Sequence, residues 1–150
     1  MTIEGLPASF VLEIVTPDRS LVTDTVDEIV VPAADGYLGV LPGHTPLLAT
    51  LAIGELWYRR GAVKSFLAIA GGFVEVLPDK VTILAQIAER AEDIDVARAE
   101  RAKKRAEERL AQAAAEIDVE RAHTSLLRAT VRLQVAAMTA AGKGTPVAPA

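Results

Sequence analysis

The sequence predicts an α+β protein in which an N-terminal antiparallel β-sandwich is followed by a C-terminal antiparallel two-helix hairpin. Over residues 10–85, short runs rich in β-branched residues alternate with turn residues, which is typical of strands. Over residues 89–141 the chain is rich in alanine, glutamate and arginine and contains neither proline nor glycine, which is typical of helices. Charge also separates the halves, because five basic residues stand against ten acidic ones up to residue 88, and eleven against ten thereafter.

Length and composition fit two small domains. The chain has 150 residues and is 51% hydrophobic, which is enough to bury a sizeable core. We expect the β-sandwich over residues 1–88 and the helical hairpin over residues 89–140. Residues 141–150 contain two glycines and two prolines and are expected to form a disordered tail.

The expected strands are separated by turn residues. Phe10, Leu12 and Ile14 fall on one face of the first run, as in a half-buried strand, and Pro17-Asp18 then supplies a turn. Turns recur at intervals of roughly eight to twelve residues with no helix between them, which favours an antiparallel sandwich or barrel over parallel crossovers. Further strands are expected over residues 26–31, 54–59, 63–70, 73–77 and 81–85.

The helical half contains one six-residue phrase twice, beginning at Ile94 and again at Ile117. In each copy the aspartate, Asp95 or Asp118, is expected to cap a helix, because its carboxylate can accept hydrogen bonds from the unpaired first-turn amides. The sequence therefore predicts two helices that start in the same way.

The predicted helices, residues 95–114 and 118–140, meet along small side chains. Their apolar residues recur at spacings of three and four, as in a coiled-coil seam. Alanine buries little area, so at about 25 cal/mol per Å² the hairpin is expected to be weakly held and easily opened. The expected inner positions are Ala99, Ala102, Ala106, Leu110 and Ala113 on the first helix and Val119, Ala122, Leu126, Ala129, Leu133, Ala136 and Ala140 on the second.

Four arginines are candidates for an anion site. Arg98 and Arg105 lie two turns apart on one face of the first helix, and Arg128 and Arg132 lie one turn apart on the second. Arg128 and Arg132 have no acidic residue within four positions, so their counter-charge must come from the first helix, a ligand or another protein. The alternative is that these arginines belong to solvated faces and pair with nearby acids, as Arg105 can with Glu108.

The residue set indicates neither catalysis nor a metal site. The chain has no cysteine, and His44 and His123 stand alone, so no metal ligands occur at metal spacing. No serine, histidine and carboxylate grouping is present, and a small nucleotide-hydrolysing enzyme would need a metal-binding or base residue set that the chain lacks. The apolar runs are too short to cross a bilayer, so no direct membrane insertion is expected.

An arginine-rich hairpin adaptor that binds nucleic acid is the alternative function. The hairpin half is only one positive charge beyond neutrality, and no aromatic residue follows Phe73 for stacking on bases. Both features are far from the footprint of nucleic-acid binders, so no nucleic-acid partner is expected.

Several motifs resemble the epsilon subunit of bacterial F-type ATP synthases, over residues 10–138. The resemblance rests on Gly36-Tyr37-Leu38-Gly39-Val40-Leu41-Pro42-Gly43-His44, on Gly71-Gly72-Phe73-Val74-Glu75-Val76, on Asp79-Lys80-Val81-Thr82-Ile83-Leu84-Ala85 and on the helix-opening Ile94-Asp95 to Arg98-Ala99. It implies a β-sandwich held against the gamma subunit and the membrane rotor ring, followed by a two-helix hairpin. Tyr37 differs from the glutamate that the family often carries in this turn.

The resemblance also implies an ATP site on the hairpin. Its ATP-binding motif is matched by Ile94, Asp95, Arg98 and Ala99, and the further residues associated with ATP are matched by Glu89, Arg105, Arg128 and Arg132. ATP is therefore expected as a regulatory ligand, with no cofactor required.

The function that this resemblance implies is that of a non-catalytic rotor subunit in the central stalk. It would couple the catalytic head to the proton-driven ring, with the gamma subunit, the ring and the catalytic alpha and beta subunits as partners. In its folded-down state the hairpin could bind ATP and would not inhibit. In its extended state it would present its cationic face to an acidic surface of the catalytic subunits and inhibit ATP hydrolysis. The expected location is the cytoplasmic face of the bacterial plasma membrane, as a peripheral protein.

Overall fold

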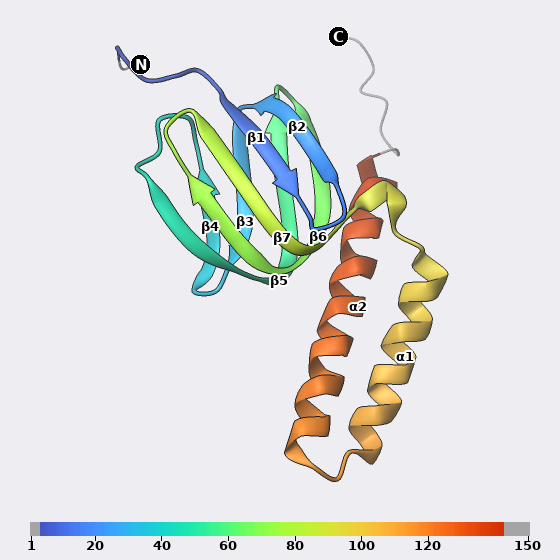
Figure 1. The fold of residues 1–150 in the computed structure, drawn as a ribbon. Helices are drawn as coiled ribbons and strands as arrows, with labels where there is room; N and C mark the ends of the chain where they lie inside the picture. The colour runs from blue at the N-terminus through green and yellow to red at the C-terminus, as the bar shows by residue number, and fades with distance from the viewer. Residues whose placement is uncertain (1–3, 143–150) are drawn as a thin grey trace. The chain divides into compact units, whose positions relative to one another are not determined.

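The computed structural model describes residues 4–142, which form two compact units that divide between Ala88 and Glu89 (Figure 1). The first unit is a β-sandwich and the second is a helical hairpin. The strands are β1 (Phe10–Val15), β2 (Ser20–Val26), β3 (Glu28–Ala33), β4 (Gly36–Val40), β5 (Leu47–Arg60), β6 (Val63–Val76) and β7 (Lys80–Arg90). The short 3-10 helix η1 (Ala91–Asp93) precedes α1 (Val96–Gln112) and α2 (Glu116–Gly142).

The strands form one continuous sheet in the order β2-β1-β7-β6-β5-β3-β4, which folds over into two layers (Figure 1). The sandwich is mostly antiparallel, as predicted, but β1 and β7 pair in parallel, with Leu12 beside Val81. A parallel pair needs a long crossover connection, and here the five intervening strands supply it in place of a helix. The expectation that a chain without interleaved helices forms only antiparallel pairs is therefore wrong for this pair.

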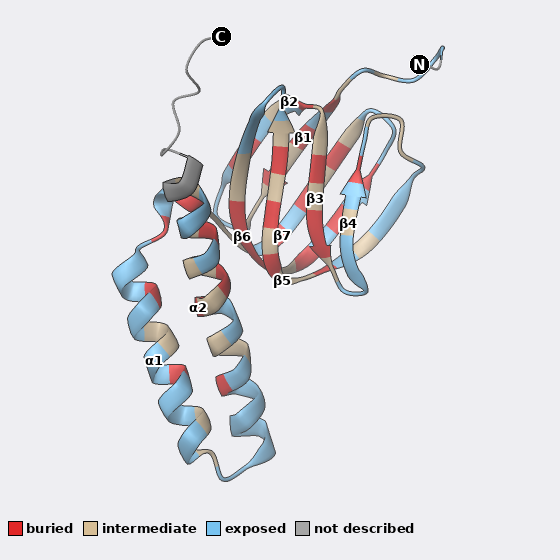
Figure 2. Cartoon of the chain, turned by 180° about the vertical axis from the view of Figure 1, so that it is seen from behind, coloured by how far each residue is buried: buried red, intermediate tan, exposed pale blue. Residues whose placement is uncertain are grey.

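Buried residues recur along the strands of the sandwich, as Figure 2 shows, and those that form its core are apolar. The predicted inward face of β1 is confirmed, because Phe10, Leu12 and Ile14 are buried. The largest fully buried side chains of the unit are Leu12, Ile14, Ile29, Leu56, Leu67, Ile69, Ile83, Val26, Val31, Val40, Val74 and Val76.

Several strand boundaries differ from the sequence expectation. Neither β2 nor β4 was predicted, because β2 carries four polar residues and β4 contains two glycines. The predicted run over residues 26–31 is instead divided between β2 and β3 at Asp27. Pairing with neighbouring strands, such as β4 on β3, supplies the stability that local propensity does not.

The pair Gly71-Gly72 lies inside β6, although the sequence indicated a turn there. Its backbone angles φ are +77° and +118°, which are conformations that favour glycine. A Cβ atom on Gly72 would overlap the carbonyl oxygen of Leu84 in β7. The two glycines therefore bend β6 and admit close approach of β7, while pairing with β5 continues on both sides, at Ala70 and at Gly72.

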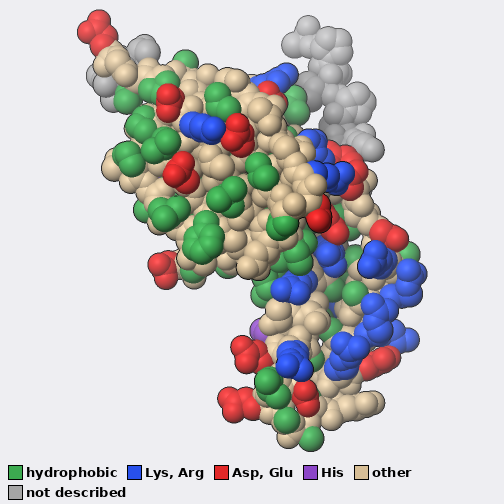
Figure 3. Space-filling model, viewed as in Figure 1, with side chains coloured by type: hydrophobic (Ala, Val, Ile, Leu, Met, Phe, Trp, Pro, Cys, Tyr) green, Lys and Arg blue, Asp and Glu red, His purple; other side chains and the backbone are tan. Residues whose placement is uncertain are grey.

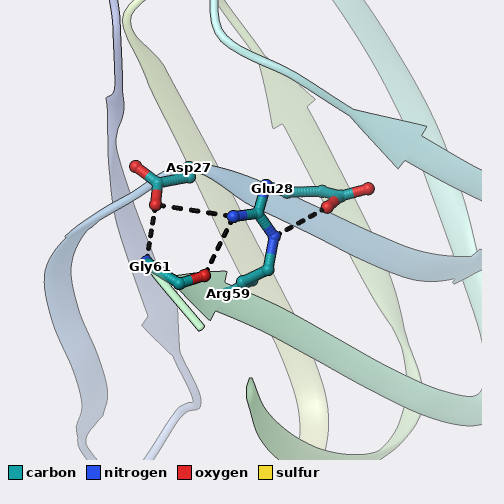
Figure 4. A network of polar contacts seen from close by, with 4 residues as sticks. All are labelled: Asp27, Glu28, Arg59 and Gly61. Carbon is teal, nitrogen blue, oxygen red and sulfur yellow. Dashed lines mark hydrogen bonds and ion pairs between the residues drawn. The ribbon is translucent and has the colours of Figure 1, made fainter. Parts of the chain in front are cut away.

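A polar network closes one end of the sandwich (Figure 4). The Arg59 guanidinium donates from Nε to Glu28 Oε2 at 3.1 Å and from Nη1 to the Gly61 carbonyl oxygen at 2.9 Å. The Gly61 amide in turn donates to Asp27 Oδ2 at 2.7 Å. One side chain thus joins the β5–β6 turn to the start of β3, through charge-assisted hydrogen bonds that are stronger than neutral ones.

The first predicted helix cap is confirmed. Asp95 is the N-cap of α1, and its Oδ1 accepts a hydrogen bond from the Arg98 amide at 3.0 Å. The cap matters because the first-turn amides of a helix have no partner within the helix.

The second predicted cap is wrong. Asp118 lies in the first turn of α2, which starts at Glu116, and the Ala115 carbonyl oxygen accepts from the Asp118 amide at 3.0 Å. Residues 113–115 connect the helices, and α2 begins two residues before Asp118. In the first turn, the carboxylates of Glu116 and Asp118 still favour the helix through its dipole.

The hairpin seam consists of small side chains, as expected. Ala99 and Ala106 of α1 and Ala122 and Ala129 of α2 are buried, but α2 also buries Val131 and Val135, which were not expected on the seam. Val119 was expected on this seam but is 42% exposed, because near the connecting loop α1 offers no buried side chain. The α2 backbone continues through residues 141–142, so the predicted tail does not begin at 141, and residues 143–150 lie outside the described part of the chain.

We predict that Gly72→Ala lowers the free energy of unfolding of the β-sandwich by about 3 kcal/mol or more, because it combines an unfavourable positive φ with a backbone overlap. Gly39→Ala is the matched control, since its Cβ would meet only Val30 Cγ2 at 4.0 Å. Urea unfolding followed by the fluorescence of the single tryptophan, Trp57, measures both variants. Equal losses in the two would show that close approach of β7 does not require glycine at position 72.

Candidate anion site of the helical hairpin

Arginines of α1 and α2 line one hollow on the flank of the hairpin. Lys and Arg side chains gather along α1 in Figure 3. Arg105, Arg128 and Arg132, three of the four arginines proposed from the sequence, lie around a hollow of about 220 Å³. Arg109 and Ser125 complete its polar lining, and Ala102, Ala106 and Ala129 form its floor. We call this the arginine hollow.

A second hollow lies beside the N-terminus of α1. Its volume is about 150 Å³, and its lining is of mixed charge. Because Arg132 lines both hollows, they adjoin at this side chain. We call the second one the mixed hollow, and its lining residues are Glu89, Asp93, Asp95, Arg98, Ala99 and Arg132.

The wall between the two hollows is held by an ion pair. Arg132 Nε donates to Glu89 Oε2 at 3.0 Å, and Arg132 Nη2 donates to Glu89 Oε1 at 3.2 Å. This forked contact fixes the plane of the guanidinium as well as its position. The counter-charge of Arg132 thus comes from the end of β7, a source that the sequence alone did not identify.

The three remaining arginines proposed from the sequence differ from Arg132. Within residues 4–142, the guanidiniums of Arg98, Arg105 and Arg128 form no ion pair and no hydrogen bond, and the possible Arg105–Glu108 pair does not form. The alternative in which nearby acids neutralise these side chains is therefore not supported for them. Like charges on facing flanks repel one another, so an anion that binds between them lowers the electrostatic energy.

The proposed site residues separate into three groups. Glu89, Asp95, Arg98 and Ala99 line the mixed hollow, whereas Arg105 and Arg128 line the arginine hollow, and Arg132 lines both. Ile94 lines neither hollow. It is buried, and its amide donates to the Ala91 carbonyl oxygen at 3.4 Å.

Sequence reasoning missed three lining residues. Arg109 is one helical turn beyond Arg105, and Ser125 is three positions before Arg128, so helical periodicity could have indicated both. Asp93 belongs to η1, whose geometry no periodic pattern predicts. Each hollow is smaller than the roughly 300–1,000 Å³ of typical small-molecule pockets, so a nucleotide-sized ligand would need both.

Two protein-family models together match most of the chain. The "ATP synthase, Delta/Epsilon chain, beta-sandwich domain" matches residues 9–91, and the "ATP synthase, Delta/Epsilon chain, long alpha-helix domain" matches residues 92–137. The chain belongs to the family of ATP synthase delta/epsilon chains. Both parts of the predicted resemblance are thereby confirmed.

Relatives within this family are similar over two thirds of the chain. The ATP synthase epsilon chain of Koribacter versatilis is 58% identical over 102 residues, which cover 68% of this chain and 72% of the relative. That of Syntrophobacter fumaroxidans is 54% identical over 99 residues, covering 66% and 74%. A chain in the cryo-EM structure of the Euglena gracilis mitochondrial ATP synthase (OSCP/F1/c-ring) superposes with a TM-score of 0.76 at 27% identity, covering 92% and 87%.

Family membership establishes the predicted class of function. The chain is a non-catalytic, peripheral subunit of the ATP synthase and serves in the rotor of its central stalk. None of the comparisons supports the nucleic-acid adaptor. Among the described residues, no helix is long and apolar enough to cross a membrane.

We predict that inorganic tripolyphosphate binds the full chain and that Arg128→Ala weakens this binding by about 1.5 to 3 kcal/mol, the range for a hydrogen bond to a charged group. Isothermal titration calorimetry measures the affinity, and circular dichroism checks that the helices persist. Arg101→Ala is the control, because it removes the same charge from an exposed position of α1 that lines neither hollow. Equal weakening in both variants would indicate diffuse attraction and no defined anion site.

Proposed function

We propose that the hairpin is an ATP-responsive regulator of this rotor subunit, which binds ATP in its closed form and inhibits ATP hydrolysis in its extended form. The observation that carries the proposal is the convergence of arginines from two helices on two adjoining hollows, with one carboxylate partner between them. Guanidiniums offer paired donors that match phosphate oxygens, so a polyphosphate is the ligand class that this arrangement favours. The matched motif Ile94-Asp95 to Arg98-Ala99 supports ATP as the member of that class.

The site couples ligand binding to the state of the hairpin. Arg98 and Arg105 belong to α1, whereas Arg128 and Arg132 belong to α2, so the full set of donors exists only while the helices are packed together. A ligand shifts a conformational equilibrium only by its differential affinity for the two states. ATP at a hundred times its dissociation constant would stabilise the closed hairpin by about 2.7 kcal/mol.

The contact between the two helices buries few large side chains. Among the described residues of α1 and α2, four of the six buried side chains are alanines, Ala99, Ala106, Ala122 and Ala129, which remove little apolar area from water, and the other two are Val131 and Val135. A hairpin held by such a seam opens at a modest cost in free energy. A ligand that stabilises the closed form by a few kcal/mol can therefore shift the equilibrium between the closed and extended forms. When the hairpin opens, the arginines become available to an acidic surface of the catalytic subunits.

The remaining parts of the proposal follow the family. The β-sandwich binds the gamma subunit and the membrane rotor ring, and the extended hairpin reaches the alpha and beta subunits of the catalytic head. In this way the subunit takes part in coupling the ring to ATP synthesis at the cytoplasmic face of the bacterial plasma membrane. The similar Euglena chain comes from a structure of an assembly that contains F1 and a c-ring, which supports these partners.

Titration of the full chain with ATP and with a short RNA, each at two salt concentrations, tests the proposed ligand. We expect ATP to bind with one site per chain and to persist at the higher salt, and RNA to bind weakly or not at all. RNA binding that falls steeply with salt, together with no ATP binding, would replace the proposal with the nucleic-acid alternative.

We predict that Asp95→Ala costs about 1 kcal/mol of helix capping and lowers ATP affinity, because it loses the hydrogen bond to the Arg98 amide. The variant destabilises the closed hairpin without removing a charge from α2. Reconstituted ATP synthase heads carrying it should therefore show stronger inhibition of ATP hydrolysis at a given ATP concentration.

Arg128→Ala and Arg132→Ala should relieve inhibition, because they remove groups offered to the head. Relief of inhibition by Asp95→Ala as well would show that the closed and inhibitory states do not compete.

A further inference from the structure

The two hollows have opposite hydrogen-bonding character. The arginine hollow is lined by four guanidiniums and one hydroxyl, so it mainly donates hydrogen bonds. The mixed hollow contains three carboxylates, and an ionised carboxylate only accepts. A ligand that spans both must carry acceptors at one end and donors at the other. A nucleotide has this polarity, with phosphate oxygens at one end and hydroxyl and amino groups at the other.

Two of the three carboxylates already have partners. Both oxygens of Glu89 accept from Arg132, and Asp95 Oδ1 accepts from the Arg98 amide. Asp93 forms no hydrogen bond or ion pair with any residue in the range 4–142. Asp93 lines the mixed hollow, so its carboxylate, with both oxygens unpaired, is available to a ligand there.

The position of Asp93 is fixed even though its side chain is exposed. It is the last residue of η1, and the residues on either side of it in the fold, Ala91 and Ile94, are buried. Asp95, two residues after Asp93, is fixed as the N-cap of α1. The carboxylate thus projects from a short segment that is anchored at both ends, which limits the entropy lost when a ligand binds it.

The size of the mixed hollow selects the part of a nucleotide that it takes. A cavity of about 150 Å³ accommodates a single six-membered ring such as benzene. The mixed hollow has about this volume, which matches a five-membered sugar ring. Vicinal sugar hydroxyls are donors that suit a carboxylate, and dinucleotide-binding folds hold ribose through an acidic residue in the same way.

We propose that Asp93 accepts hydrogen bonds from the ribose hydroxyls of the bound nucleotide and makes the site selective for ribonucleotides over 2′-deoxyribonucleotides. In this arrangement the sugar lies in the mixed hollow and the phosphates lie toward the arginine hollow, past the shared Arg132. The inference rests on the proposed binding of ATP and adds a specificity residue to it.

Calorimetric titration of the full chain with ATP and with 2′-deoxy-ATP tests the inference. The wild-type protein should bind ATP about tenfold more tightly, near the lower end for a hydrogen bond to a charged group, because Asp93 is exposed. Asp93→Ala should weaken ATP binding and bring this ratio close to one. Both ligands carry the same charge, so the ratio is insensitive to the loss of a negative charge near the phosphates.

Glu92→Ala is the matched control, because Glu92 is the neighbouring exposed acid of η1 and lines neither hollow. It should keep the wild-type ratio. A wild-type ratio of one overturns the inference without any variant, and an unchanged ratio in Asp93→Ala overturns it while leaving ATP binding intact. If the wild-type chain binds neither nucleotide, the proposed ATP site fails, and the role of Asp93 fails with it.

Discussion

The forked ion pair between Glu89 and Arg132 is the contact on which the hairpin site depends. It joins residues 43 positions apart, linking the end of β7 to the middle of α2. Without it, the guanidinium that forms the wall between the two hollows would have no fixed plane. The pair is half-exposed, so its contribution to stability is small, about 0 to 1 kcal/mol for such surface pairs. Its role is geometric, because it presents one arginine to both hollows at once.

Small residues provide the second constraint, in each unit for a different reason. In the sandwich, Gly72 lets the β7 backbone approach β6, and no other residue fits beside the Leu84 carbonyl oxygen. In the hairpin, alanines such as Ala106 and Ala129 bring the helices close while burying little area. The sandwich is thus tightly packed through its glycines and large apolar core, whereas the hairpin combines close helices with a weak seam. This contrast fits the proposed function, in which the N-terminal unit is a stable attachment and the C-terminal unit responds to a ligand.

A site shared between two weakly packed helices has a physical advantage for regulation. Its donors come from both helices, so binding energy acts directly on the contact between them. In the proposed function the same arginines bind the ligand in one state and a protein surface in the other, so the two states exclude each other. A site on one rigid helix would bind the ligand equally well in either state and could not shift the equilibrium.

The sequence by itself determined the features that depend on neighbouring residues. Alternation identified the inward face of β1, and the chemistry of an aspartate before a run of helix formers identified the cap at Asp95. Helical spacing placed Arg98 and Arg105 on one face of α1, although the two line different hollows. The motifs indicated the family that the comparisons establish.

Only the tertiary structure decided the features that depend on distant partners. The strand β4 exists because β3 pairs with it, and Gly71-Gly72 stays inside β6 because β5 pairs on both sides. The start of α2 lies at Glu116 and not at Asp118. The partner of Arg132 and the free carboxylate of Asp93 became visible only when β7, η1 and α2 were placed together. Such contacts join residues far apart in the chain, and no local pattern records which of many possible partners will meet.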